Sequence, residues 1–66
     1  MQTDLAVLAR LTREATAGFR RAAHRCGNAA SLEESLDWGL SMRTWAAVRG
    51  DLIAERLALL EQRRAG

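Results

Sequence analysis

Residues 32–64 read LEESLDWGLSMRTWAAVRGDLIAERLALLEQRR, and this proline-free half of the chain decides the fold. The spacing of its apolar residues predicts one long helix, on which they fall into two stripes instead of one. The leucine stripe comprises Leu32, Leu36, Leu40, Ala47, Ala54, Leu57 and Ala58. The tryptophan stripe comprises Trp38, Met42, Trp45, Leu52, Leu59 and Leu60. A helix that packs on one neighbour needs an apolar arc of about 100°, so this helix is expected to need more than one partner.

The first part of the chain predicts a second helix, over residues 4–26. Its apolar residues recur every three or four positions and form one narrow face: Leu5, Leu8, Leu11, Ala15, Phe19, Ala22 and Cys26. Thr3 is the expected N-cap, with Asp4 in the first turn, where the helix dipole favours negative charge. Gly18 interrupts this helix at a cost of about 1 kcal/mol relative to alanine. We expect the close approach of another helix beside Phe19 to compensate.

Gly27 and Asn28 separate the two helices, and either residue can adopt the left-handed conformation that ends a helix. Ser31 and Glu34 have the spacing of a capping box, in which each side chain accepts from the backbone N–H of the other residue. Ala47, Ala54 and Leu57 of the leucine stripe stay in phase across Gly50, which favours one continuous helix over 32–64. A new helix capped by Asp51 is the alternative.

These features predict an all-α fold, an antiparallel two-helix hairpin that forms a single domain over residues 1–66. A chain of this length buries only about 60% of its unfolded surface, so we expect the hairpin to dimerise into a four-helix bundle. The first helix is expected to cover the leucine stripe and to leave the tryptophan stripe for another chain. The interface residues predicted on this basis are Leu36, Trp38, Met42, Trp45, Leu52 and Leu59.

The charged residues are ten arginines, no lysine and eight acids, a usage that fits a GC-rich bacterial genome. Residues 1–28 carry five arginines against two acids, and residues 29–66 carry five arginines against six acids. This difference in sign favours packing of the two halves on each other or on a second copy. The N-terminus lacks the basic region of a signal peptide, and Cys26 is the only cysteine, so a cytoplasmic location is expected. Cys26 is interpreted as a small hydrophobe on the apolar face.

No residue pattern predicts catalysis, cofactor binding or a metal site. His24, the only histidine, falls on the polar face of its helix without a nucleophile or carboxylate at helical spacing. The Glu-x-x-His pair of dimetal bundles and the glycine-rich phosphate loop are both absent. Arg20, Arg21 and Arg25 lie where the helix dipole favours cations, and no aromatic residue is interleaved with them. The pattern therefore does not favour nucleic acid as a partner.

Two short stretches carry a resemblance to a known group. Residues 18–23 read GFRRAA, and residues 43–47 place Trp45, Ala46 and Ala47 after Arg43. These stretches are similar to those of small bacterial ferritin-like helical-hairpin proteins of unknown function. That family fold has four helices, so the resemblance implies that two copies of this hairpin make the four-helix unit. It implies no established activity, and it transfers no metal ligands because matching ligands are absent.

The function expected from the sequence is a non-enzymatic protein–protein interaction or scaffold module that acts as a homodimeric four-helix bundle. One alternative is a small adaptor or co-chaperone whose second helix docks a larger helical protein. A further alternative is a basic accessory protein that binds nucleic acid.

Overall fold

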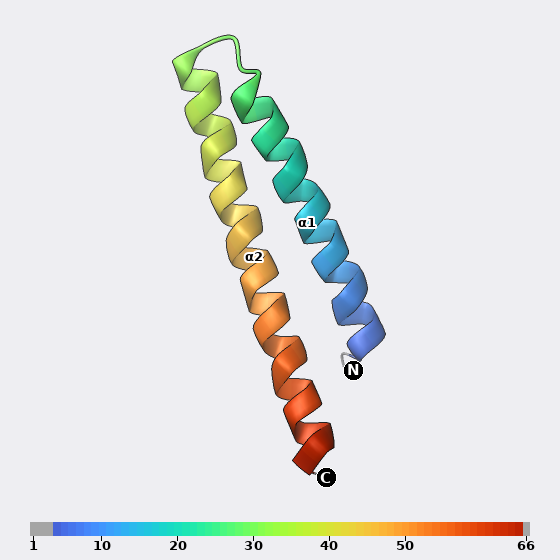
Figure 1. Cartoon of the computed structure of the whole chain (residues 1–66). Coiled ribbons are helices and arrows are strands. Elements are labelled where there is room, and N and C mark those ends of the chain that lie inside the picture. The colour runs from blue at the N-terminus through green and yellow to red at the C-terminus, as the bar shows by residue number, and fades with distance from the viewer. Residues whose placement is uncertain (1–3, 66) are drawn as a thin grey trace.

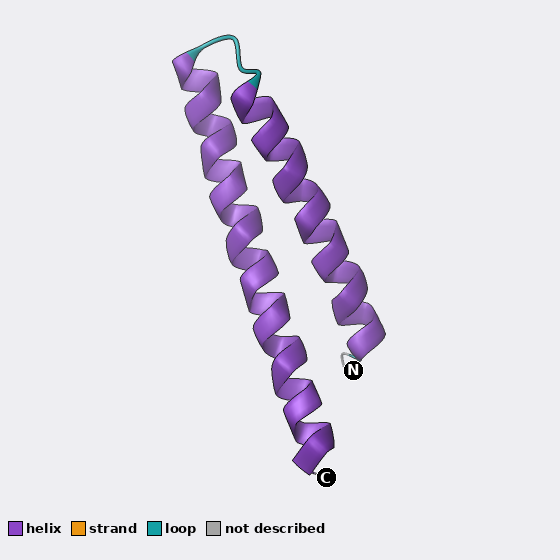
Figure 2. Cartoon of the chain, viewed as in Figure 1, coloured by secondary structure: helices purple, strands orange, loops and turns teal. Residues whose placement is uncertain are grey.

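The computed structural model describes residues 4–65, which form two antiparallel helices joined by a short connection (Figure 1). Helix α1 spans Leu5–Gly27 and helix α2 spans Leu32–Ala65. Among the described residues there is no strand, as Figure 2 shows. The prediction of an all-α helical hairpin is therefore confirmed. The molecule is a rod with extents of 53 × 18 × 14 Å, and the C-terminal turns of α2 run past the first turn of α1 (Figure 1).

Helix α1 begins after Asp4 because the side chain of that residue accepts a hydrogen bond from the backbone N–H of Val7 at 2.8 Å. An N-cap oxygen of this kind satisfies one of the amide groups that have no partner within the first turn. The prediction that Thr3 is the cap is wrong, since Asp4 fills that position. Thr3 itself lies outside the described residues.

Helix α1 ends through Asn28 without any left-handed residue. Asn28 has φ −111° and ψ 15°, and its backbone N–H donates to the carbonyl oxygen of His24 at 3.1 Å. The side-chain Nδ2 of Asn28 donates to the same oxygen at 2.8 Å. No described residue has a positive φ, so the predicted left-handed conformation at Gly27 or Asn28 is wrong. The asparagine amide satisfies the terminal carbonyl group instead.

Helix α2 begins at the predicted cap. The backbone N–H of Glu34 donates to Ser31 Oγ at 3.1 Å, which confirms the serine half of the capping box. The return bond differs from the prediction, because Glu34 Oε2 accepts from the backbone N–H of Ala30 at 3.2 Å and not from Ser31. From there α2 continues through Gly50 to Ala65, so the prediction of one continuous helix is confirmed.

The core lies between α1 and the tryptophan stripe, which reverses the predicted packing. The side chains of Leu8, Ala15 and Ala22 on α1 are each 1% exposed. Across from them, Trp38 and Trp45 are half-buried, whereas the leucine stripe lies on the other side of α2 and is exposed. The prediction that α1 covers the leucine stripe is therefore wrong. Alanine and glycine on the inner face of α1 leave room for the bulk of the two indoles, and this match of large against small decides the packing.

Gly18 shows how closely the two helices approach. A Cβ atom built on Gly18 would lie 2.5 Å from Cδ2 and 2.8 Å from Cζ2 of Trp45, too close for any side chain. The predicted close approach of α2 near Phe19 is thus confirmed, and the group that requires the glycine is the indole of Trp45.

Candidate interaction surface

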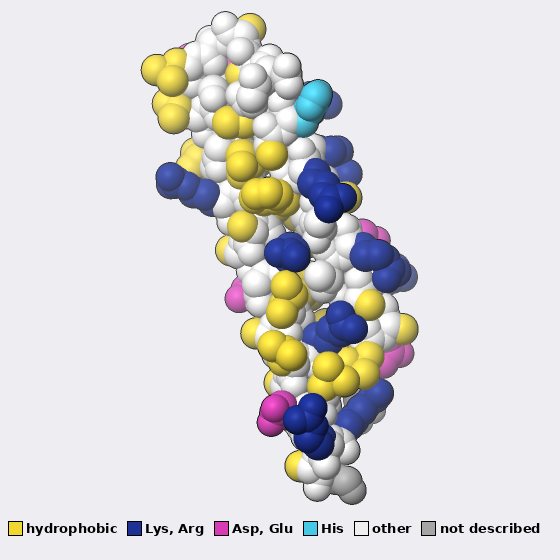
Figure 3. Space-filling model, viewed as in Figure 1, with side chains coloured by type: hydrophobic (Ala, Val, Ile, Leu, Met, Phe, Trp, Pro, Cys, Tyr) yellow, Lys and Arg dark blue, Asp and Glu magenta, His cyan; other side chains and the backbone are white. Residues whose placement is uncertain are grey.

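The leucine stripe holds four of the six large hydrophobic residues that are exposed among the described residues. Leu32 is 77% exposed, Leu36 62%, Leu40 60% and Leu57 57%. The small residues of the stripe, Ala47, Ala54 and Ala58, are exposed as well. Figure 3 shows hydrophobic side chains on the α2 edge near the end where the helices are joined, and others along the middle of the molecule. A row of exposed leucines of this kind is typical of a binding site for another protein.

The total surface area of the hairpin is large for its mass. The accessible area is 5252 Å² for a chain of 7.3 kDa. A compact monomer of that mass is expected to expose about 4,200 Å². The excess is comparable to the roughly 800 Å² that each partner buries in a standard protein–protein interface. The hairpin thus exposes about as much extra surface as one such interface covers.

The interior of the hairpin is correspondingly small. Among the described residues, Leu8 is the only large side chain that is fully buried, and the other buried side chains are alanines. Burial of one leucine contributes about 1.5–3 kcal/mol, and the half-buried side chains of the tryptophan stripe add to it, against the conformational entropy of two ordered helices. Further burial of apolar surface would stabilise the fold, and the exposed leucine stripe is where such surface is available.

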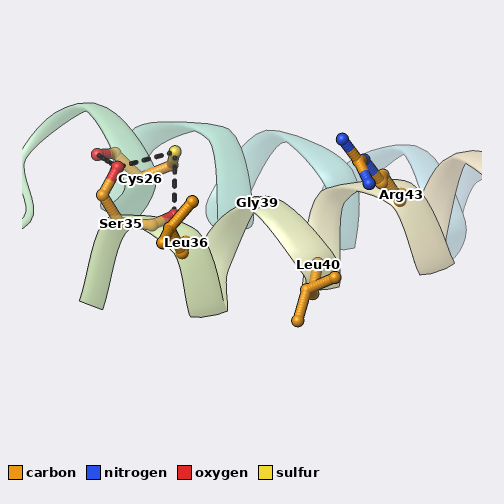
Figure 4. Close-up of a pocket in the computed structure, with 6 residues that line it drawn as sticks. All are labelled: Cys26, Ser35, Leu36, Gly39, Leu40 and Arg43. Carbon is orange, nitrogen blue, oxygen red and sulfur yellow. Dashed lines mark hydrogen bonds between the residues drawn. The ribbon is translucent and has the colours of Figure 1, made fainter. Parts of the chain in front are cut away.

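One end of the leucine stripe borders a groove beside the interhelix connection. The groove is lined by Cys26, Ser35, Leu36, Gly39, Leu40 and Arg43 (Figure 4). The thiol of Cys26 donates to the carbonyl oxygen of Ser35 at 3.3 Å, and Ser35 Oγ donates to the carbonyl oxygen of Cys26 at 3.3 Å. These two bonds tie the last turn of α1 to the first turns of α2. The half-buried thiol therefore has polar partners, in addition to its expected place on the apolar face.

The six predicted interface residues fall into two groups. Leu36 belongs to the exposed leucine stripe, while Trp38, Met42, Trp45, Leu52 and Leu59 are half-buried and belong to the stripe that faces α1. The guanidinium carbon of Arg25 lies 5.0 Å from the ring centroid of Trp38, and Trp45 covers Gly18. Both tryptophans thus have partners within the chain. The role of these residues in contacts with another chain stays a prediction.

A sequence signal for the correct packing was present on α1. Ala15, Gly18 and Ala22 form its buried small-residue face together with Leu8. Small residues on one helix complement indoles on the other, whereas they would leave gaps against a row of leucines. Periodicity alone does not use the size of side chains, and for this reason it did not distinguish the two stripes.

The remaining polar surface is mostly basic on α1. Arg10, Arg13, Arg20, Arg21 and His24 are all exposed. Arg49 of α2 reaches across to α1, where its Nε donates to Thr16 Oγ1 at 3.0 Å. Within residues 4–65, no three His, Cys, Asp or Glu side chains are grouped so that they could hold a metal ion. Neither of the two described helices has a segment apolar enough to cross a membrane.

Comparison with known proteins gives no relative from which a function follows. No family model, no curated protein and no solved structure matches this chain. The resemblance to ferritin-like hairpins stays a prediction.

Proposed function

We propose that the protein is a non-enzymatic protein–protein interaction module that acts as a homodimer and uses the leucine stripe as its interface. The observation that carries the proposal is the exposure of Leu32, Leu36 and Leu40, each at least 60%, on a hairpin whose own core is very small. Two hairpins joined in this way contain four helices, the number that the ferritin-like resemblance implies. A cytoplasmic location is part of the proposal.

A second copy is the partner that the stripe fits most directly. Each copy carries the same leucine stripe, so a second copy is always present with a matching apolar surface. Two-fold dimers are also the commonest oligomers of soluble proteins. Monomers rarely expose a contiguous apolar patch of more than a few hundred Å², because burial of apolar surface contributes about 25 cal/mol per Å². A dimer buries the stripe of both chains without requiring any change in the hairpin.

Sedimentation equilibrium tests this proposal with a matched pair of variants. Leu40→Asp introduces a charge in the stripe, and Val48→Asp introduces the same charge at a residue that is 40% exposed and lies off the stripe by helical spacing. The wild type and Val48→Asp are expected to be dimers, and Leu40→Asp is expected to be a monomer. A folded wild-type monomer over the whole micromolar range would contradict the proposal and favour the adaptor function instead. Equal dimer stability in all three proteins would exclude the leucine stripe as the interface.

A further inference from the structure

The charges of α2 are distributed unequally between its two ends. Glu33 and Glu34 lie in its first turn, and Arg63 and Arg64 lie in its last turn. The helix dipole favours this arrangement within one chain. The same distribution also makes the two ends of α2 complementary to each other. Two α2 helices side by side therefore attract at both ends when antiparallel and repel at both ends when parallel.

We infer that the second copy lies antiparallel to the first along the leucine stripe, so that the two α2 helices form the centre of the dimer. This inference rests on the proposed homodimer and assigns its geometry. When the full lengths of α2, Leu32–Ala65, overlap in opposite directions, Leu40 is level with Leu57 of the second copy. In the same register Glu33 is level with Arg64 of the second copy. Apolar residues thus meet in the body of the interface, and the oppositely charged ends of the two α2 helices lie beside each other.

The charged residues within the stripe disfavour the parallel alternative. By helical spacing, Arg43 and Glu61 fall on the same side of α2 as the leucines. A parallel dimer would place Arg43 against Arg43 and Glu61 against Glu61, and like charges held opposite each other are destabilising. In the antiparallel register Arg43 is level with Ala54 and next to Glu55 of the second copy. Antiparallel packing also opposes the two helix dipoles.

The middle of the stripe has the small residues that a close helix crossing needs. Ala47 and Gly50 are level with each other in the antiparallel register. A Cβ atom built on Gly50 would meet no atom of this chain within 4 Å, so nothing inside the hairpin requires a glycine there. Glycine in the interior of a helix nevertheless destabilises the helix relative to alanine. Close contact with α2 of the second copy at this point explains why residue 50 is a glycine.

The geometry determines what the dimer presents to its surroundings. Because α1 packs on the side of α2 that carries the tryptophan stripe, each α1 lies on the outside, away from the second copy. The two interhelix connections lie at opposite ends of a rod about 50 Å long, at roughly 1.5 Å per residue of α2. The dimer therefore presents two identical basic α1 surfaces on opposite sides.

Distances between spin labels test the orientation. In a Cys26→Ser background, one variant carries a label at Gln62→Cys and the other at Val48→Cys, both at exposed positions. In the antiparallel dimer the two labels at residue 62 are expected about 40 Å apart, and in a parallel dimer under about 20 Å. The two labels at residue 48 lie near the centre and are expected within about 25 Å in either orientation, given helices 8–10 Å apart.

The two labels separate the possible failures. A short distance at residue 48 together with a distance of about 40 Å at residue 62 supports the antiparallel dimer. Short distances at both positions overturn the orientation but leave the homodimer in place. The absence of a dipolar signal at residue 48, with circular dichroism still helical, overturns the homodimer itself and with it the orientation.

Discussion

The indole of Trp45 lies against the backbone of Gly18 so closely that position 18 has no room for a side chain. This contact joins the middle of α1 to the middle of α2, and it fixes which side of α2 faces inward. Replacement of Gly18 by alanine is therefore expected to destabilise the hairpin. Displacement of the ring costs roughly 1–3 kcal/mol, whereas alanine gains about 1 kcal/mol over glycine in helix propensity. The net loss of stability is therefore expected to reach about 2 kcal/mol.

The matched control is Gly39→Ala, because a Cβ atom at Gly39 would meet nothing within 4 Å. That substitution is expected to increase the free energy of unfolding by up to about 1 kcal/mol. Urea unfolding followed by circular dichroism at one protein concentration measures both variants. If Gly18→Ala were stabilised as much as Gly39→Ala, the packing of Trp45 against α1 would be incorrect.

Ser31 is expected to contribute to stability through its bond from the backbone N–H of Glu34, 3.1 Å long. Ser31→Ala removes this acceptor and is expected to cost about 1 kcal/mol, the usual value for loss of an N-cap side chain. Ser31→Asp retains an acceptor and adds favourable charge at the helix N-terminus, so it is expected to restore the stability. Thermal unfolding of the three proteins measures the effect, and equal loss in both variants would argue against capping.

Arg25 and Trp38 are expected to interact through a cation–π contact, since the guanidinium lies 5.0 Å from the ring centroid. Such contacts contribute about 0.5–1 kcal/mol at exposed sites. A double-mutant cycle with Arg25→Ala and Trp38→Leu isolates this term from the separate effects of the two side chains. A coupling free energy near zero would show that the two side chains pack independently.

Gly50→Leu is expected to separate the stability of the hairpin from that of the dimer. Leucine is a better helix former than glycine, and residue 50 has open space within the chain, so the hairpin itself is not weakened. The larger side chain would hold the two α2 helices apart at their proposed crossing and raise the dimer dissociation constant by about tenfold, since overpacking of a contact costs about 1–3 kcal/mol. Analytical ultracentrifugation at several concentrations measures this constant. A variant as dimeric as the wild type would place the crossing elsewhere.

The helices and their ends could be read from the sequence to the extent that local chemistry decides them. Apolar spacing predicted both helices, and Ser31 with Glu34 predicted the start of α2. The N-terminal cap was missed by one residue because Thr3 and Asp4 are adjacent and either can act as a cap. The end of α1 was predicted at the right place with the wrong conformation, because Asn28 uses its side-chain amide in place of a left-handed backbone.

The packing of the two helices could not be read from periodicity. Both stripes of α2 repeat with helical spacing, so each is an equally good inner face by that criterion. The choice depends on the size of the groups on α1, where Gly18 accommodates the indole of Trp45. The complementary residues are far apart in the chain, so their fit is found only when the side-chain sizes on the inner face of α1 are compared with those on each stripe of α2.

The unequal lengths of the helices have a consequence for the order in which the amides exchange with solvent. The last turns of α2 extend past the start of α1, so the single hairpin offers them no neighbour from α1 (Figure 1). Short helical segments without tertiary contacts are marginal in water, and their amide hydrogens exchange early. In the antiparallel dimer these turns lie beside the first turns of the other α2. Protection of the final amides would then appear only at protein concentrations at which the dimer forms.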